Sequence, residues 1–272
     1  MINNDSQKRL EKTLEIASLA GEILMKHWKT TLDITYKKDE FDPVTIADQE
    51  SDDYIRKAIK EAFPEDSILS EENTENPDSF DGKVWMIDPL DDTKAFAEGL
   101  DCFSVSIGCV VDGRPNIGVV YAPARSTFYF GGLSVGGAFM RKNGIEQKLE
   151  GSSRSTITES RIIVGLPSKA IRPLNEKVAN IPFSQFIEDG SICIALGRLA
   201  AGDAECTINT NPRVSKWDSA AGQAIIEAVG GIVTDIHDNP LDYTQTERNW
   251  ENLVAASANP KIHKEFIVHL NA

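Results

Sequence analysis

Long apolar runs and cysteine pairs are both missing from this sequence. No window approaches the roughly 18 to 20 uninterrupted apolar residues of a membrane-spanning helix, and the polar N-terminus lacks the apolar stretch of a secretory signal. The four cysteines are irregularly spaced and form no CxxC pair. We therefore expect a cytoplasmic protein whose cysteines are reduced core residues and which has no membrane partner.

Basic residues are scarce relative to acidic ones. The chain carries 28 Lys and Arg side chains against 42 Asp and Glu, which gives a formal net charge of −14. A surface of that sign repels nucleic acid and anionic membranes, so we expect no nucleic-acid partner. The length of 272 residues and the hydrophobic share of 41% are those of a folded protein with a sizeable core.

Apolar periodicity predicts helices first and strands after them. Helical spacing over 6–28 predicts one amphipathic helix, and Thr45 with Asp48 resembles a capping arrangement at the start of a second. The dipeptides Asp112-Gly113 and Asn143-Gly144 are hairpin signals, so the short apolar runs around them predict an antiparallel sheet. These runs lie at 67–70, 84–88, 103–111, 116–122 and 126–130.

A stretch rich in Ser, Thr and Gly, at 148–160, divides the pattern in two. Beyond it, predicted strands alternate with predicted helices, which is typical of α/β structure. These elements lie at 161–166, 184–188, 192–204, 217–229 and 232–235. We expect an N-terminal α+β half over 1–150 and a C-terminal α/β half over 151–272 that completes a shared site.

The string WMIDPLDDTKAF at 85–96 carries the strongest chemical signal. A buried strand delivers Asp88, proline breaks the strand, and Asp91 follows at a turn that enters a helix. Two carboxylates at this spacing, with the Leu90 carbonyl between them, can converge on a hard divalent cation. Capping of the turn and of the next helix explains them equally well at this point.

Two further strings carry acidic residues at the ends of predicted elements: SEE at 70–72 and WDSAAG at 217–222. Together with the string at 85–96, in this order and at these separations, they resemble the inositol monophosphatase superfamily of magnesium-dependent, lithium-sensitive phosphomonoesterases. The similarity runs over nearly the whole chain. It implies a layered αβαβα sandwich, usually assembled as a homodimer, and a phosphoric monoester hydrolase that acts on a small phosphorylated substrate.

The resemblance also implies a site with two or three Mg²⁺ ions. The positions that match the family's metal ligands are Glu71, Asp88, the Leu90 carbonyl, Asp91 and Asp218. Thr93 matches the hydroxyl that helps to orient the attacking water, Asp48 matches its acidic partner, and Glu71 counts among the catalytic groups as well. Metal charge would gather the phosphate oxygens and activate water for in-line attack, so no covalent enzyme intermediate is required.

Substrate contacts follow from the same resemblance. Gly190 and Ser191 match the segment that contacts the sugar or polyol, and the backbone N–H groups of Asp92 and Thr93 would cradle the phosphate. One position departs from the family, which usually has glycine where this chain has Asp92. Glycine permits unusual backbone angles there, and aspartate tolerates them better than most residues, but its carboxylate repels phosphate or recruits a cation. Asp92 therefore leaves two hypotheses open, a working hydrolase and a catalytically weakened regulatory or interaction protein.

The substrate itself rests on weaker signals. Lys94 after Thr93 resembles the CysQ-type 3′(2′),5′-bisphosphate nucleotidases, which favours hydrolysis of adenosine 3′,5′-bisphosphate to AMP. Arg213, with Lys216, could hold a second phosphate, although solvated loop charges explain both equally well. Ile194 lies where this branch often has a lysine. Inositol 1-phosphate and histidinol phosphate remain alternatives.

Overall fold

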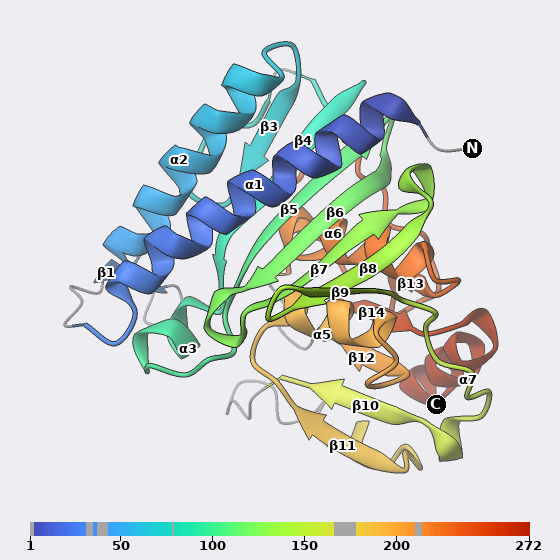
Figure 1. Ribbon diagram of the computed structural model, residues 1–272. Helices are drawn as coiled ribbons and strands as arrows, with labels where there is room; N and C mark the ends of the chain where they lie inside the picture. Colours follow the sequence, from blue (N-terminus) through green and yellow to red (C-terminus); the bar gives the residue numbers. More distant parts are fainter. Residues whose placement is uncertain (1–2, 31–34, 37–42, 78, 166–177, 210–213) are drawn as a thin grey trace.

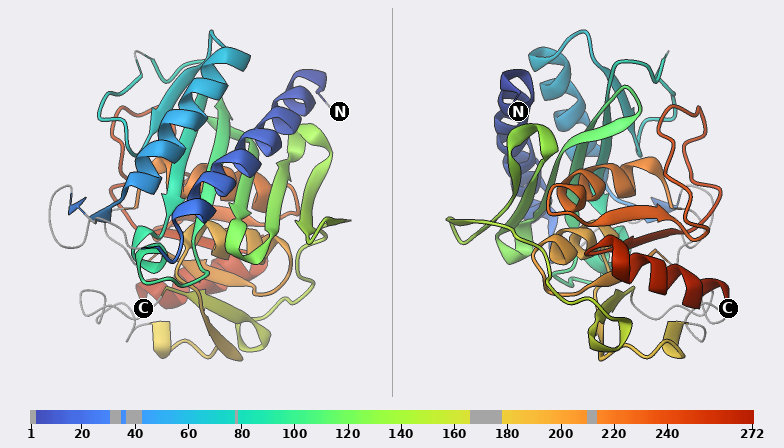
Figure 2. Two further views of the ribbon diagram at one scale, coloured as in Figure 1. Left: turned by 60° about the vertical axis from the view of Figure 1, so that its left-hand side comes forward. Right: turned by 90° about the vertical axis from the view of Figure 1, so that its right-hand side faces the viewer.

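The computed structural model describes residues 3–30, 35–36, 43–77, 79–165, 178–209 and 214–272. Its elements form five layers in the order helices, sheet, helices, sheet, helix, as Figures 1 and 2 show. This arrangement confirms the predicted αβαβα sandwich. A separate two-stranded ribbon pairs β1 (Thr35–Tyr36) with β2 (Pro43–Val44).

The first layer consists of α1 (Asn4–His27) and α2 (Ile46–Ala62), which lie side by side on the first sheet (Figure 1). The α2 helix begins as the sequence predicts. The Thr45 side chain accepts a hydrogen bond from the start of the helix, and the Asp48 carboxylate accepts one from the Thr45 backbone N–H. This reciprocal capping satisfies backbone donors that a helix start otherwise leaves unpaired, and it holds Asp48 at a defined position.

The first sheet has seven strands in sequential order. They are β3 (Ser67–Ser70), β4 (Lys83–Asp91), β5 (Ser104–Val111), β6 (Arg114–Ala122), β7 (Thr127–Gly132), β8 (Gly137–Lys142) and β9 (Ile145–Lys148). Only β3 and β4 pair in parallel; the later strands are antiparallel neighbours. Asp112-Gly113 and Asn143-Gly144 both have positive φ, as tight hairpin turns require, and both predicted hairpins are confirmed.

The β4 strand separates two apolar cores. Val84 and Met86 belong to the core between the two sheets, whereas Trp85 and Ile87 belong to the core beneath α1 and α2. Because side chains alternate along a strand, a strand buried on both faces reads as an uninterrupted apolar run. This burial fixes the strand that carries the candidate metal ligands.

The prediction that proline breaks this strand is wrong. The β4 strand continues through Pro89 to Asp91, with a register shift between Asp88 and Asp91, so that Asp88 lies opposite Ser106 and Asp91 opposite Ser104. Proline lacks the N–H that a regular ladder needs and is tolerated at such an irregularity. The bulge turns both carboxylates toward the C-terminal part of the chain.

The third layer consists of α5 (Ile192–Ala200) and α6 (Lys216–Glu227), and α6 lies very close to the first sheet. A Cβ atom on Gly108 would lie 2.8 Å from the Ala221 backbone nitrogen, and one on Gly118 would lie 2.1 Å from its carbonyl oxygen. These paired glycines leave room for the helix backbone, and α6 therefore brings its N-terminal residues down to the end of β4.

The second sheet and the last helix complete the sandwich. The sheet has the order β11 (Gln185–Glu188), β10 (Arg161–Val164), β12 (Cys206–Ile208), β14 (Val254–Ser257), β13 (Ile232–Asp235), and α7 (Pro260–Asn271) covers its outer face (Figure 2). The short elements are α3 (Thr93–Ala97), η1 (Pro123–Arg125), η2 (Leu133–Val135) and η3 (Ile157–Glu159). All four cysteines are buried and unpaired, as expected. None of the helices in the described ranges combines the length and hydropathy that crossing a bilayer requires.

Candidate active site

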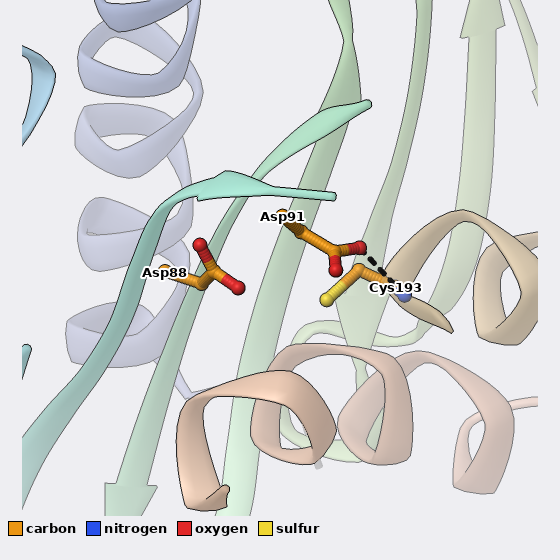
Figure 3. A group of neighbouring side chains, drawn as sticks. All are labelled: Asp88, Asp91 and Cys193. Carbon is orange, nitrogen blue, oxygen red and sulfur yellow. Dashed lines mark hydrogen bonds between the residues drawn. The ribbon is translucent and has the colours of Figure 1, made fainter. Parts of the chain in front are cut away.

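Asp88 and Asp91 face each other at the end of β4. Both are nearly inaccessible, with 2% and 8% of their surface exposed. One Asp88 oxygen accepts a hydrogen bond from the Leu90 backbone N–H at 3.0 Å, and Asp91 accepts one from the Cys193 backbone N–H at 3.1 Å. Figure 3 shows the Asp88 carboxylate pointing toward Asp91 and the Asp91 carboxylate pointing toward Cys193. Neither forms an ion pair with a basic side chain among the described residues.

Glu71 approaches this pair from the neighbouring strand. It follows β3 directly, and its backbone N–H donates to the Ile87 carbonyl of β4 at 3.1 Å. Its charge contributes to the raised pKa of Asp88. The carbonyls of Ser70 and Glu71 accept hydrogen bonds from the Arg248 guanidinium at 2.5 Å and 3.4 Å, so the chain around this carboxylate is held at the strand end.

Asp218 arrives from the other half of the chain, in the first turn of α6. Its carboxylate accepts the Ser215 backbone N–H at 2.6 Å and completes a capping box. The adjacent Trp217 ring packs under the Arg248 guanidinium at 4.9 Å. Arg248 thus contacts both the Glu71 backbone and the residue before Asp218, which links the two halves beside the site.

Burial and the charges of neighbouring carboxylates determine the electrostatics of Asp88, Asp91 and Asp218. Burial, followed by the charges of Glu71, Asp91 and Asp218, raises the pKa of Asp88 well above its usual value. Burial also raises the pKa of Asp91 and of Asp218, and neighbouring carboxylates add to each shift. Water no longer solvates these carboxylates, and each repels the next.

This donor set fits a hard divalent cation. Carboxylate and carbonyl oxygens are the protein ligands that Mg²⁺ takes, and a bound cation would neutralise the repulsion that raises these pKa values. Carboxylate oxygens of Asp88 and Asp91 lie within 4.8 Å of each other, and Glu71 and Asp218 lie near enough for their charges to raise the pKa of Asp88. The Leu90 carbonyl accepts a hydrogen bond from the Thr93 hydroxyl.

Capping, the alternative from the sequence, accounts for the hydrogen bond from the Leu90 N–H to Asp88, whereas the N-cap of the next helix is Asp92. It leaves Asp88 and Asp91 without an ion pair to any basic side chain in the described part of the chain.

Thr93 and Asp48 also meet as the sequence predicts. The Thr93 hydroxyl lies 3.1 Å from an Asp48 oxygen and 3.2 Å from the Leu90 carbonyl oxygen. The second Asp48 oxygen accepts hydrogen bonds from the Thr45 N–H and hydroxyl at 2.7 Å and 2.6 Å. Burial raises the pKa of Asp48 to about 6 against these hydrogen bonds. The capping box of α2 therefore holds the acidic partner of Thr93.

Asp92 adopts the conformation that glycine would favour. Its φ of 63° and ψ of 58° lie in the left-handed region, and its carboxylate caps α3 by accepting the Ala95 N–H at 3.0 Å. Burial, then the charges of Asp91 and Asp189, raises its pKa to about 7. The side chain therefore occupies the Ala95 N–H and not the N–H groups of Asp92 and Thr93, which the resemblance assigns to phosphate.

Gly190 and Ser191 lie against the same two residues. A Cβ atom on Gly190 would lie 2.0 Å from an Asp92 carboxylate oxygen, so a larger residue there would displace this carboxylate. The Ser191 hydroxyl donates to Asp91, lies 3.1 Å from the Ser104 hydroxyl, and caps α5 through the Ile194 N–H at 2.9 Å. The predicted substrate segment therefore adjoins Asp91, a candidate metal ligand.

The basic residues considered for a second phosphate are less well placed. Arg213 lies outside the described residues. The Lys216 ammonium donates to the Gln245 carbonyl and lies 4.6 Å from the Phe80 ring centre, so it belongs to the core. Ile194 is buried, with 1% of its surface exposed. Within the described part of the chain, neither Lys216 nor Ile194 is placed to contact a phosphate.

Three residues near the site were not singled out from the sequence. Ser104 lies opposite Asp91 in the sheet, Arg248 binds the end of β3, and the Cys193 thiol faces Asp88 and Asp91. In the string GSIC at 190–193 the cysteine follows the predicted substrate segment directly, but nothing in the string distinguishes it from an ordinary core cysteine. The sequence alone does not identify Ser104 or Arg248. Ser104 depends on the register between β4 and β5, and Arg248 depends on the path of the loop that carries it.

Comparison with known proteins agrees with this geometry. The model of the inositol monophosphatase family matches residues 5–271. A histidinol-phosphatase of Chlorobaculum parvum is 31% identical over 266 residues, which cover 92% of this chain and 96% of that protein. A 3′(2′),5′-bisphosphate nucleotidase CysQ of Aggregatibacter actinomycetemcomitans is also 31% identical, over 88% of both chains.

A solved structure supports the fold independently. The extragenic suppressor protein SuhB of Bartonella henselae superposes with a TM-score of 0.83 over 97% of this chain and 98% of that chain, at 24% identity. Members of the matching family use divalent metals, typically Mg²⁺. The chain therefore belongs to the inositol monophosphatase family and is, as its sequence predicts, a magnesium-dependent phosphoric monoester hydrolase.

Proposed function

We propose that this hydrolase releases phosphate from a small monoester at the site formed by Glu71, Asp88, Asp91, Asp218 and Thr93. The observation that carries the proposal is the proximity of carboxylates from both halves of the chain, of which Asp88 and Asp91 are buried, with raised pKa values for Asp88, Asp91 and Asp218. Two or three Mg²⁺ ions would be held by these carboxylates and by the Leu90 carbonyl. Bound Mg²⁺ supplies positive charge that draws in the phosphate oxygens and makes a water more acidic.

The chain's own residues would orient that water. The Thr93 hydroxyl can accept a hydrogen bond from water while it donates to Asp48, which lies 3.1 Å away. Asp48 is itself fixed by the backbone and side chain of Thr45. Because Thr93 also contacts the Leu90 carbonyl, a water bound there would lie beside the proposed ligands.

The substrate class follows from the charges around the substrate segment. The sequence favours adenosine 3′,5′-bisphosphate, which is supported by the likeness to CysQ and by Lys94. The Asp92 carboxylate beside Gly190 and the core position of Lys216 instead favour a monoester with a single phosphate and hydrogen-bond donors next to it. We propose the single-phosphate class and keep the bisphosphate as the second candidate.

A panel of substrates tests this proposal. Phosphate release from inositol 1-phosphate, histidinol phosphate and adenosine 3′,5′-bisphosphate is measured side by side with Mg²⁺ and with a chelator. We expect magnesium-dependent turnover with a higher kcat/KM for a single-phosphate ester. A higher kcat/KM for the bisphosphate would instead support the substrate that the sequence favours. Absence of turnover on all three substrates would contradict the proposed site.

Three further predictions from the sequence remain proposals: the division into halves, the homodimer and the lithium sensitivity. The division into halves over 1–150 and 151–272 is consistent with the two sheets, which meet through one shared core. We also keep the homodimer and the lithium sensitivity that the resemblance implies. Light scattering at several protein concentrations, and inhibition by Li⁺ of Mg²⁺-dependent turnover, would test them.

A further inference from the structure

The Cys193 thiol lies among the carboxylates of the candidate metal site. Ligand atoms of Asp88, Asp91 and Cys193 all lie within 4.8 Å of one another, and none of the Cys193 surface is exposed. Figure 3 shows its sulfur pointing into the space between the two carboxylates. A sulfur at this position adds a donor of a different chemical kind to a set of oxygens.

The backbone holds this thiol in place. Cys193 lies in the first turn of α5, and its N–H donates to Asp91 at 3.1 Å. Its Sγ donates to the Asp218 carbonyl at 3.4 Å. The residue therefore contacts two of the proposed ligand residues, one from each half of the chain. Its backbone and its sulfur are both held by hydrogen bonds.

The other three thiols lie elsewhere. Cys109 belongs to the core beneath α1 and α2, and Cys206 to the core beneath α7. Cys102 is the nearest competitor, because it adjoins Gly190 and lies within the field of the Asp92 carboxylate. Cys102 therefore offers a matched control for any effect assigned to Cys193.

Sulfur and oxygen ligands prefer different divalent cations, because soft cations bind thiolate and hard cations bind oxygen. Mg²⁺ takes oxygen ligands and leaves a thiol uncoordinated, whereas Zn²⁺ and Cd²⁺ bind thiolate together with carboxylate. We propose that Asp88, Asp91 and Cys193 form a binding site for a thiophilic divalent cation of the Zn²⁺ or Cd²⁺ class, which competes with Mg²⁺. On binding, the Cys193 S–H bond breaks, a sulfur–metal bond forms, and the proton leaves to solvent.

This inference rests on the proposed function, because the same two carboxylates would serve both cations. A thiophilic ion bound there would exclude Mg²⁺ from Asp88 and Asp91, so the cysteine would make the enzyme sensitive to inhibition by such ions. A chain with serine or alanine at this position would keep the oxygen ligands and lose that sensitivity. Cys193 would thus decide which metals the site accepts.

Cadmium provides a probe that does not depend on turnover. Cd²⁺ is titrated into the full-length wild type and into Cys193→Ser and Cys102→Ser, and the thiolate-to-cadmium charge-transfer absorption is recorded. We expect a saturable band in the wild type that excess Mg²⁺ suppresses, loss of the band with at least about tenfold weaker Cd²⁺ binding in Cys193→Ser, and an unchanged band in Cys102→Ser. Circular dichroism confirms that each variant is folded.

The outcomes separate this inference from the proposed function. A band that persists in Cys193→Ser, that vanishes in Cys102→Ser, or that Mg²⁺ does not suppress would overturn the inference, as would a folded wild type without any band. A magnesium-suppressible band that depends on Cys193, in a protein without phosphatase turnover, would support the inference and contradict the proposed function. Should Cys193→Ser fail to fold, Cys193→Ala is measured in the same way.

Discussion

Two kinds of buried carboxylate occur in this protein. Glu205 is wholly buried, yet its oxygens accept hydrogen bonds from the Arg161 guanidinium at 2.9 Å, the Arg161 N–H at 2.7 Å and the Ser152 hydroxyl at 2.7 Å. Although burial opposes it, these hydrogen bonds lower its pKa. Asp88 is about as deeply buried, but other carboxylates surround it and its pKa is raised.

The difference shows which buried charges the fold itself neutralises. Asp189 lies directly before Gly190, and one of its oxygens accepts hydrogen bonds from Arg125 at 2.8 Å and Arg198 at 2.9 Å. Like Glu205, Asp189 is paired with arginine side chains of the same chain. Proximity to the site therefore does not determine whether a buried carboxylate has a basic partner. A buried carboxylate without a counter-charge is costly. Asp88 and Asp91 are therefore the positions at which we propose that a cation from solution supplies the missing positive charge.

The largest effect on catalysis is expected when Asp91, which forms no ion pair among the described residues, loses its charge. Asp91→Asn should lower kcat/KM by at least about 100-fold, because the charge that metal supplies to the transition state contributes several kcal/mol. Steady-state phosphate release with Mg²⁺ measures it. Glu205→Gln is the matched change at a paired carboxylate and should keep Mg²⁺-dependent turnover. Equal losses in the two variants would remove the distinction between the two kinds.

The free energy of unfolding should show the opposite order: a change at the paired Glu205 should cost more stability than a change at Asp88. Glu205→Gln should destabilise the fold by about 2–3 kcal/mol, the low side for a broken buried ion pair, because Arg161 remains partly exposed. Asp88→Asn in the metal-free protein should cost little or stabilise, because it removes repulsion and its oxygen can still accept the Leu90 N–H. Chemical denaturation of both variants in a chelating buffer tests this contrast. A larger loss for Asp88→Asn would show that the fold compensates its charge after all.

The pH dependence of stability also distinguishes the carboxylates with raised pKa values from the paired Glu205. A group whose pKa is raised on folding contributes stability that is present at low pH and lost as the pH rises through its folded value. Asp88, Asp91 and Asp218 have raised values, with Asp48 at about 6 and Asp92 at about 7. The metal-free protein should thus melt at a higher temperature near about pH 5 than near about pH 8, relative to Asp88→Asn.

The comparison with Asp88→Asn serves as the control, because groups common to both proteins cancel. Glu205 remains ionised across this window, since its pKa is lowered. Added Mg²⁺ should raise the melting temperature more near about pH 8, where the carboxylates are ionised, than near about pH 5. Parallel melting curves for the wild type and Asp88→Asn would contradict the raised pKa values.

The smallest effect is expected at Asp92. Asp92→Gly should change stability by only a few tenths of a kcal/mol, because glycine suits the left-handed backbone and substitutes well at a helix start. Removing the carboxylate should raise kcat/KM by less than about tenfold, most for the bisphosphate substrate. Asp92→Asn keeps the cap and removes only the charge. A strong rise from near zero in both variants would favour the weakened regulatory protein instead.

Local sequence signals predicted much of the fold. The β3 strand coincides with the predicted run at 67–70, and Thr45 and Asp48 form the capping box that their spacing indicates. Both hairpins form where Asp112-Gly113 and Asn143-Gly144 place them. The path through Pro89 was not predictable in this way, because a bulge depends on the register with β5, which a single strand does not contain.

The candidate site was predictable only in part. The resemblance identified Glu71, Asp88, Asp91 and Asp218, and the structure brings them together. The close packing of Asp92 on Gly190 was not foreseeable, because it depends on how α3 and the start of α5 meet across the halves. The same holds for the Cys193 thiol, which reads as an ordinary core cysteine in the sequence.

Calorimetric titration of the metal-free protein with Mg²⁺, in neutral buffers of different ionisation enthalpy, tests the central claim most directly. The account predicts that Mg²⁺ binds, that binding releases protons from the carboxylates whose pKa values are raised, and that Asp91→Asn weakens binding while Glu205→Gln does not. Absence of Mg²⁺ binding to the folded wild type, or equal affinity in wild type and Asp91→Asn, would contradict it.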